Sequence, residues 1–175
     1  MTGKEKPSTL HHRRRTIRLA GYDYTHPGAY FLTIDTWQYE CLFGEIVNSM
    51  MILNEMGELV SEEWLKTPEI RREIQLDVFQ IMPNHLHGII IINDVGAHGR
   101  APLPNGSQPI RQPHSLGSFV AGFKSVTTKR INIFRDTPGA PVWQRNYYEH
   151  VIRSEDELEH IRQYILANPL NWVES

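Results

Sequence analysis

Two histidines separated by one residue are the first side chains in this sequence that could do chemistry. His85 and His87 begin an apolar run, residues 85–92, that has the composition of a buried strand. Side chains at positions i and i+2 of a strand point to the same face, so both imidazoles are expected to project side by side. Neutral imidazole is a common metal ligand. The spacing therefore indicates either a metal site or a pair of hydrogen-bonded histidines.

A second group of polar side chains lies near the end of the chain. His160, Tyr164 and Asn168 are spaced four residues apart and share one stripe of an expected helix. Packing of Tyr164 against a sheet, with its hydroxyl in water, explains this residue without chemistry. Asn168 precedes Pro169, so its simplest role is to end the helix.

Residues 143–150 mix aromatic side chains with Arg145. Such a segment could stack on nucleobases while the guanidinium pairs with phosphate. The alternative is an aromatic strand that packs in the core. Tyr147 and Tyr148 lie in this segment, and each of them carries a phenol, as Tyr164 does.

The charge is unevenly distributed along the chain. The net charge of the whole chain is −2, but the first 18 residues carry +5 and the remainder −7. A basic arm that includes Arg13, Arg14 and Arg15 could contact a polyanion, or it could be a solvated terminus. No apolar run approaches the length of a membrane helix, and no signal peptide is recognisable. The single cysteine, Cys41, excludes an internal disulfide, and the expected location is a reducing cytoplasm.

Hydrophobic periodicity predicts an α+β fold. Two helices that cross between antiparallel strands favour a ferredoxin-like sandwich, with helices mainly on one face of a central antiparallel sheet. Residues 1–15 are expected to form a flexible basic arm, and residues 16–175 a single domain with a mobile loop at 94–114. Strands are expected over residues 30–36, 74–82 and 85–92 and within 141–152, a hairpin over 41–53, and helices from 54 to before Pro68, over 115–134 and from a capping box at 154 to about 167.

Four segments together resemble the single-tyrosine HUH transposases, and especially the REP-associated tyrosine transposases. They are Met82-Pro-Asn-His-Leu-His-Gly88, Gly122-Phe-Lys-Ser125, Val142-Trp-Gln-Arg-Asn-Tyr-Tyr-Glu-His150 and Tyr164-Ile-Leu-Ala-Asn-Pro169. The resemblance spans about residues 17–172 in the family's order. It is specific as a combination, whereas each segment alone is weak.

The resemblance implies a set of roles. His85 and His87 would be paired ligands of a divalent metal, Mg²⁺ or Mn²⁺, and Tyr164 the nucleophile. Asn168 matches a position where related enzymes place a third, amide ligand, often Gln. Attack by Tyr164 would leave a 5′-phosphotyrosine and a free 3′-OH, and the retained phosphodiester energy would let one site both cleave and rejoin DNA. Tyr147 and Tyr148 are rival nucleophiles by residue type alone.

The implied partner is single-stranded or hairpin DNA, handled by a monomer or a homodimer. One alternative is a domesticated, non-catalytic module that binds structured DNA or RNA. Another is a zinc hydrolase built on the two histidines, which would be indifferent to Tyr164. The basic residues expected to contact DNA, or else to form solvated surface, are Arg13, Arg14, Arg15, Lys124, Lys129, Arg130 and Arg145.

Overall fold

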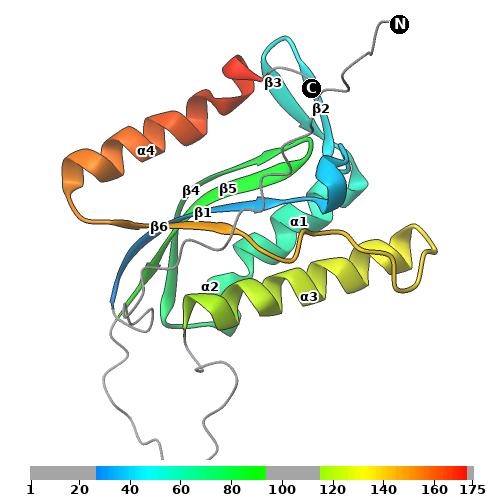
Figure 1. Ribbon diagram of the computed structural model, residues 1–175, viewed down its shortest axis with the longest axis horizontal. Coiled ribbons are helices and arrows are strands. Elements are labelled where there is room, and N and C mark those ends of the chain that lie inside the picture. Colours follow the sequence, from blue (N-terminus) through cyan, green and yellow to red (C-terminus); the bar gives the residue numbers. More distant parts are fainter. Residues whose placement is uncertain (1–26, 94–114, 173–175) are drawn as a thin grey trace, which may run out of the picture.

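The computed structural model describes residues 27–93 and 115–172 (Figure 1). The expected basic arm, with Arg13, Arg14 and Arg15, and the expected loop at 94–114 lie outside the described residues. No helix in the described ranges is long and apolar enough to cross a membrane.

A four-stranded antiparallel sheet forms the centre of the fold. Its strands are β1 (Gly28–Asp35), β4 (Ile74–Met82), β5 (His85–Ile92) and β6 (Tyr148–Ile152), in the order β4-β5-β1-β6. With one long helix between β1 and β4 and another between β5 and β6, this order is that of a ferredoxin-like sheet. The predicted fold class is therefore confirmed.

A separate hairpin follows β1. It pairs β2 (Gly44–Val47) with β3 (Met50–Leu53), and Asn48 and Ser49 at its turn have φ values of 50° and 61°. Positive φ at both central residues is the geometry of a two-residue hairpin turn. The predicted hairpin is confirmed, and the structure also adds a short helical turn, η1 (Trp37–Tyr39), before it.

Two long helices, α1 (Glu55–Leu65) and α3 (Leu116–Phe134), cover one face of the sheet (Figure 1). A short helix, α2 (Thr67–Ile70), lies between α1 and β4. Trp64 is fully buried in this layer, against the rings of Phe119 and Phe123. A side chain at Gly88 of β5 would collide with Trp64, because a Cβ there would lie 2.5 Å from the indole ring.

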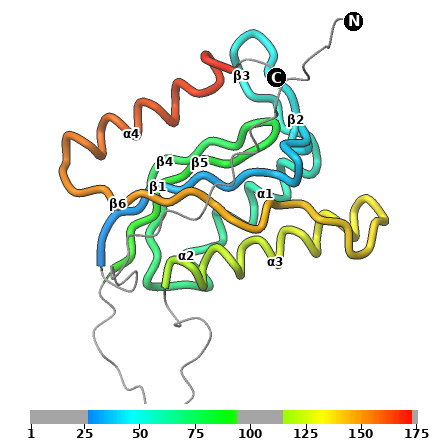
Figure 2. Tube along the Cα trace, in the orientation of Figure 1, coloured from blue at the N-terminus to red at the C-terminus, as the bar shows by residue number. Residues whose placement is uncertain are grey.

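The last helix, α4 (Glu155–Ala167), lies on the opposite face (Figure 2). Its Ile165 is fully buried against Phe31, Ile89 and Ile152, so this face has a second, smaller apolar core. The predicted cap forms only in part: Ser154 Oγ accepts from Glu157 N, while the Glu157 carboxylate accepts from Arg153 N instead of from Ser154 N. The predicted arrangement, with helices mainly on one face, thus holds for α1–α3, and α4 is the exception.

An ion pair fixes α4 to the edge strand. Arg162 Nη2 and Nε donate to the two carboxylate oxygens of Asp77 on β4, at 2.6 and 3.1 Å. The hydrogen bond from Arg162 lowers the pKa of Asp77. A two-pronged contact of this kind sets orientation as well as distance.

The close approach of Trp64 to β5 makes a test of the packing on the α1–α3 face. We expect Gly88→Ala to lower the free energy of unfolding by about 1–3 kcal/mol, because the new methyl group must displace the indole ring. Gly122→Ala is the matched control. Gly122 lies exposed in α3 with no atom within 4 Å of a built Cβ, so this change is expected to raise stability by up to about 1 kcal/mol. Urea denaturation would measure the free energy of unfolding of both variants. An equal change in Gly88→Ala and Gly122→Ala would contradict the close packing of Trp64 on β5.

Candidate active site around a histidine pair

A cavity of about 540 Å³ lies between α4 and the face of the sheet that α4 covers. Alternate residues of β1 form part of its floor, because Phe31, Thr33 and Asp35 point to this face. The other described lining residues come from β5, β6, α4 and the segments next to them: Tyr39, Asn84, His85, His87, Tyr148, Tyr164, Asn168 and Trp172.

The two histidines face each other within the cavity. Their Nε2 atoms are 3.1 Å apart, as the i, i+2 spacing predicts for neighbours on one face. The outer nitrogens also have partners: His85 Nδ1 donates to Asn84 Oδ1 at 2.7 Å, and His87 Nδ1 is 2.8 Å from Thr33 Oγ1. Hydrogen bonds at Nδ1 fix the ring orientation and, at His85, place the lone pair on Nε2, the atom that faces His87 Nε2.

Both imidazoles are neutral at physiological pH. Burial lowers the pKa of His85 to about 4, an effect that the nearby Asn168 side chain partly opposes. Burial, and then the charge of His85, lowers the pKa of His87 to about 3. The neutral form is the one that binds metal ions. Burial therefore keeps both rings in the form that a metal ligand requires.

Tyr164 faces the histidine pair from α4. The centres of the Tyr164 and His87 rings are 5.4 Å apart, and 54% of Tyr164 is exposed. Asn168, one turn later, also lines the cavity, and its Nδ2 donates to Tyr164 O at 3.4 Å. His160 does not line the cavity: it is exposed, and its Nδ1 donates to Asp156 O at 2.8 Å. Thus the predicted stripe contributes two of its three members to the cavity.

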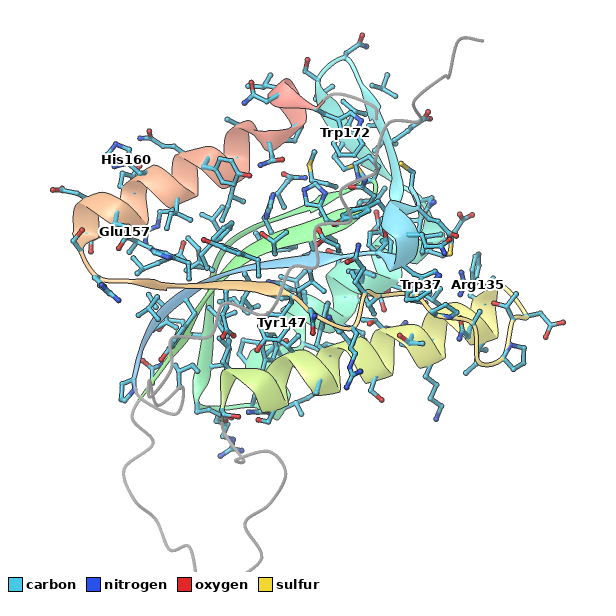
Figure 3. The ribbon with its side chains drawn as sticks, in the orientation of Figure 1. Trp37, Arg135, Tyr147, Glu157, His160 and Trp172 are labelled. Atoms are coloured by element: carbon cyan, nitrogen blue, oxygen red, sulfur yellow. The ribbon has the colours of Figure 1, made fainter. Side chains whose placement is uncertain are left out.

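The two other candidate tyrosines lie in different surroundings. Tyr148 lines the cavity and is paired with Thr33 across β1 and β6, while its ring centre is 6.0 Å from that of Phe31. Tyr147 packs against the core on the α3 side, with Lys124 Nζ 5.5 Å from its ring centre (Figure 3). Of these two candidates, it is Tyr148 that shares the cavity with Tyr164.

The donor set fits a divalent cation that also binds substrate oxygens. Among the described residues no three His, Cys, Asp or Glu side chains are placed to hold a metal ion. Two imidazoles and the Asn168 amide are a smaller set, which leaves coordination positions open. Asp35 is the only Asp, Glu, Lys or Arg among the described residues that line the cavity. With both histidines neutral, the described lining residues offer no positive charge to an anion.

The basic residues expected to contact DNA are spread over other parts of the fold. Lys124 and Arg130 have partners within the chain: Lys124 Nζ donates to Gln144 O and Asn146 O at 2.8 and 3.0 Å, and the Arg130 guanidinium pairs with Glu62 and Glu63. Burial lowers the pKa of Lys124 to about 8, against the opposing charge of Asp35. Lys129 and Arg145 are exposed. A DNA contact at any of these residues stays a prediction.

Six lining residues had no role in the sequence-based hypothesis: Phe31, Thr33, Asp35, Tyr39, Asn84 and Trp172. Asp35 pairs with His85 across β1 and β5. Strand pairing of this kind places it beside His85, although the residues are 50 positions apart. Only the register of the two strands, which the sequence pattern does not specify, could have identified it.

The buried histidine pair predicts a pH-dependent stability. Folded His85 and His87 bind protons only near pH 4 and 3, whereas unfolded histidines bind them near pH 6.5. The stabilisation is therefore complete above pH 6.5 and is lost as the pH falls. We expect the free energy of unfolding of the metal-free protein to decrease between pH 6.5 and 5, by up to about 1.4 kcal/mol per pH unit for each histidine. Urea titrations in EDTA would measure it, and an equal slope in a His85→Gln/His87→Gln variant would contradict the assignment.

The fold is that of a transposase of known structure. No family model matches the chain. Among solved structures, a REP-associated tyrosine transposase bound to a REP hairpin superposes with a TM-score of 0.57 and covers 86% of this chain and 71% of its own. The two sequences are 18% identical, so the likeness is one of fold.

A second relative is much more similar to this chain in sequence than the solved transposase is. An uncharacterized protein of Haemophilus influenzae is 43% identical over 169 residues, which cover 92% of this chain and 91% of the relative. The chain therefore belongs to the same protein family as this Haemophilus influenzae protein.

Proposed function

We propose that the protein is a metal-dependent transposase or endonuclease that cleaves and rejoins single-stranded DNA near hairpins, through a 5′-phosphotyrosine at Tyr164. The observation that carries the proposal is the position of Tyr164, whose ring centre lies 5.4 Å from that of His87 at a cavity that also holds the converging Nε2 atoms of the histidine pair. A nucleophile and a metal-ligand pair at one cavity are the components that phosphodiester cleavage requires.

The charge of the cavity supports a metal requirement. With neutral histidines and Asp35 as the charged lining residue, a phosphate would meet no positive charge among the described lining residues. His85, His87 and Asn168 would hold the ion, and a bound Mg²⁺ or Mn²⁺ would supply charge that stabilises the phosphate during displacement. Imidazole ligands favour Mn²⁺ over Mg²⁺, which prefers oxygen.

The covalent step exchanges one phosphodiester for another. The Tyr164 oxygen forms a bond to phosphorus while the bond to the 3′-oxygen breaks, and the 3′-oxygen leaves as a hydroxyl after taking up a proton. Tyr164 is about half exposed, and we expect water to accept the phenolic proton. Rejoining is the reverse step with a different 3′-OH, so it needs no external energy source.

Two observations bear on the substrate and the active unit. The solved transposase of the same fold is bound to a REP hairpin, which supports hairpin DNA as the substrate. Within a single chain, the Arg162–Asp77 ion pair and buried Ile165 already dock α4 beside the histidine pair. This docking supports a monomer as the active unit.

A covalent capture experiment tests the nucleophile. We expect the protein to form a denaturation-resistant adduct with labelled single-stranded hairpin oligonucleotides from the DNA flanking its gene, in Mn²⁺ or Mg²⁺. Tyr164→Phe removes the attacking oxygen and should reduce the adduct to background, whereas Tyr148→Phe, at the same cavity, should retain it.

The other outcomes separate the competing hypotheses. An adduct that persists in Tyr164→Phe and is lost in Tyr148→Phe would move the nucleophile to β6. Hairpin binding without an adduct in either metal would favour the non-catalytic binding module. A metal-dependent hydrolysis without an adduct that is unaffected by Tyr164→Phe would favour the zinc hydrolase.

The hydrogen bond from His85 to Asn84 predicts an effect on metal affinity. Asn84→Ala leaves both ligand residues in place but removes the oxygen that orients His85, so Mn²⁺ affinity should fall by about 10–100-fold. Isothermal titration would measure this affinity. Asn84→Asp, which keeps an acceptor at the same position, should retain most of it, and His87→Ala should lose it. Unchanged Mn²⁺ affinity in Asn84→Ala would show that Asn84 does not orient a metal ligand.

A further inference from the structure

A turn with a left-handed backbone lies beside the histidine pair. Within η1, Gln38 and Tyr39 have φ values of 54° and 60°. Two consecutive non-glycine residues in this region are unfavourable, and such conformations persist where the surroundings hold them and where the strain serves a function.

The surroundings of the turn do hold it in place. Thr36 is fully buried, and its hydroxyl lies 2.8 Å from Glu40 O and 2.9 Å from Asn84 O. Thr36 N also donates to Asn84 O at 2.9 Å, and Trp37 N donates to Val142 O at 2.8 Å. The turn is thus attached to the backbone of the residue that precedes His85.

The result is a partly exposed aromatic side chain at the cavity. Tyr39 lines the cavity and keeps 49% of its surface exposed. From the other end of the chain, half-buried Trp172 lines the same cavity, with its ring centre 6.0 Å from that of His85 and the two planes 35° apart. In Figure 3, Trp172 lies beyond the end of α4. Aromatic surface left exposed at a cavity is available to a flat, apolar ligand face.

We propose that Tyr39 and Trp172 form a stacking subsite for an unpaired nucleobase, next to the phosphate that binds at the histidine pair. The inference rests on the proposed function and deepens it by naming the two residues that would hold a base of the single-stranded substrate. Base stacking on aromatic side chains contributes strongly to single-strand binding, and it tolerates every base because each one has a π-face. The subsite therefore selects for an unpaired nucleotide and gives little base specificity.

The size of the cavity agrees with this ligand. Its volume of about 540 Å³ lies in the range of pockets for small ligands, about 300–1,000 Å³. A nucleobase within a duplex has both faces covered by its neighbours, so it offers nothing to Tyr39. Cleavage at this site would therefore require that the nucleotide beside the scissile phosphate be unpaired.

Fluorescence of 2-aminopurine tests the subsite directly. The probe is a hairpin oligonucleotide from the DNA flanking the gene, with 2-aminopurine placed in turn at each single-stranded position. It is titrated with Tyr164→Phe protein in Mn²⁺, because this variant should bind the DNA without cleaving it. We expect quenching at one position beside the cleavage site. Adding Tyr39→Ala should abolish that quenching and weaken binding about 10-fold, whereas adding Tyr39→Phe should retain both.

Trp37→Ala is the matched control for Tyr39→Ala. Trp37 belongs to the same turn and is 39% exposed, but it does not line the cavity. Its removal should leave quenching and affinity unchanged. A second control is in the DNA: with an abasic residue at the quenched position, proteins with Tyr39 and with Tyr39→Ala should bind with equal affinity. In the same assay Trp172→Ala should lose quenching and Trp172→Phe should keep it. Circular dichroism of each variant checks folding.

The outcomes distinguish this inference from the proposed function. If the protein with Tyr164 forms the covalent adduct but Tyr39→Ala behaves as Trp37→Ala does, the stacking subsite is wrong and the cleavage activity stands. If quenching depends on Tyr39 but no adduct forms, the subsite stands and the cleavage activity is wrong. Absence of binding to every oligonucleotide overturns both.

Discussion

The pairing of β1 with β5 is the constraint on which the candidate site depends. This ladder aligns Thr33 with His87 and Asp35 with His85, so it sets both the hydrogen bond at His87 and the neighbour of His85. The opposite side of β1 carries Tyr30, Leu32 and Ile34, all fully buried against the α1–α3 layer. A slip of one residue would exchange the two faces and bury Thr33 and Asp35 in the apolar core. Packing on one face of the sheet thereby maintains the chemistry on the other.

One face of the sheet thus stabilises the fold, and the other carries the candidate site. On the α1–α3 side, even the charged groups serve the fold: Arg130 joins α3 to α1 through Glu62 and Glu63, and Lys124 holds the carbonyls of Gln144 and Asn146. On the α4 side, polar and aromatic groups remain accessible at the cavity. Lys124 links the two sides, because the segment that it holds leads into β6, where Tyr148 faces the cavity.

Much of the fold could be predicted from local patterns. Alternation and apolar runs placed β4 and β5 at their observed bounds. Helical periodicity placed the start of α3 at Ser115, and the capping-box pattern at Ser154 identified the start of α4. The i, i+2 spacing also indicated that His85 and His87 share a face. These features depend on residues a few positions apart, for which periodicity is a direct signal.

Features that arise from distant contacts could not be predicted in this way. The side of the sheet that α4 covers depends on Arg162 meeting Asp77, 85 positions away. The intramolecular partners of Lys124 and Arg130 could not be predicted for the same reason. A basic stripe on a helix has the same sequence pattern whether it contacts other groups of the chain or solvent. Tyr39 reaches the cavity through a left-handed turn that neither Gln38 nor Tyr39 favours by residue type.

The small apolar surface that α4 buries has a consequence for local opening of the fold. Ile165 is the one fully buried side chain of this helix, whereas α3 buries residues along its whole length. Local opening costs least where the least apolar surface is covered, so α4 can detach and reseat while the sheet and the α1–α3 layer stay folded. Amide hydrogens of α4 should consequently exchange with solvent sooner than those of β5. The helix that carries Tyr164 is thus held less firmly than the α1–α3 layer that covers the other face of the sheet.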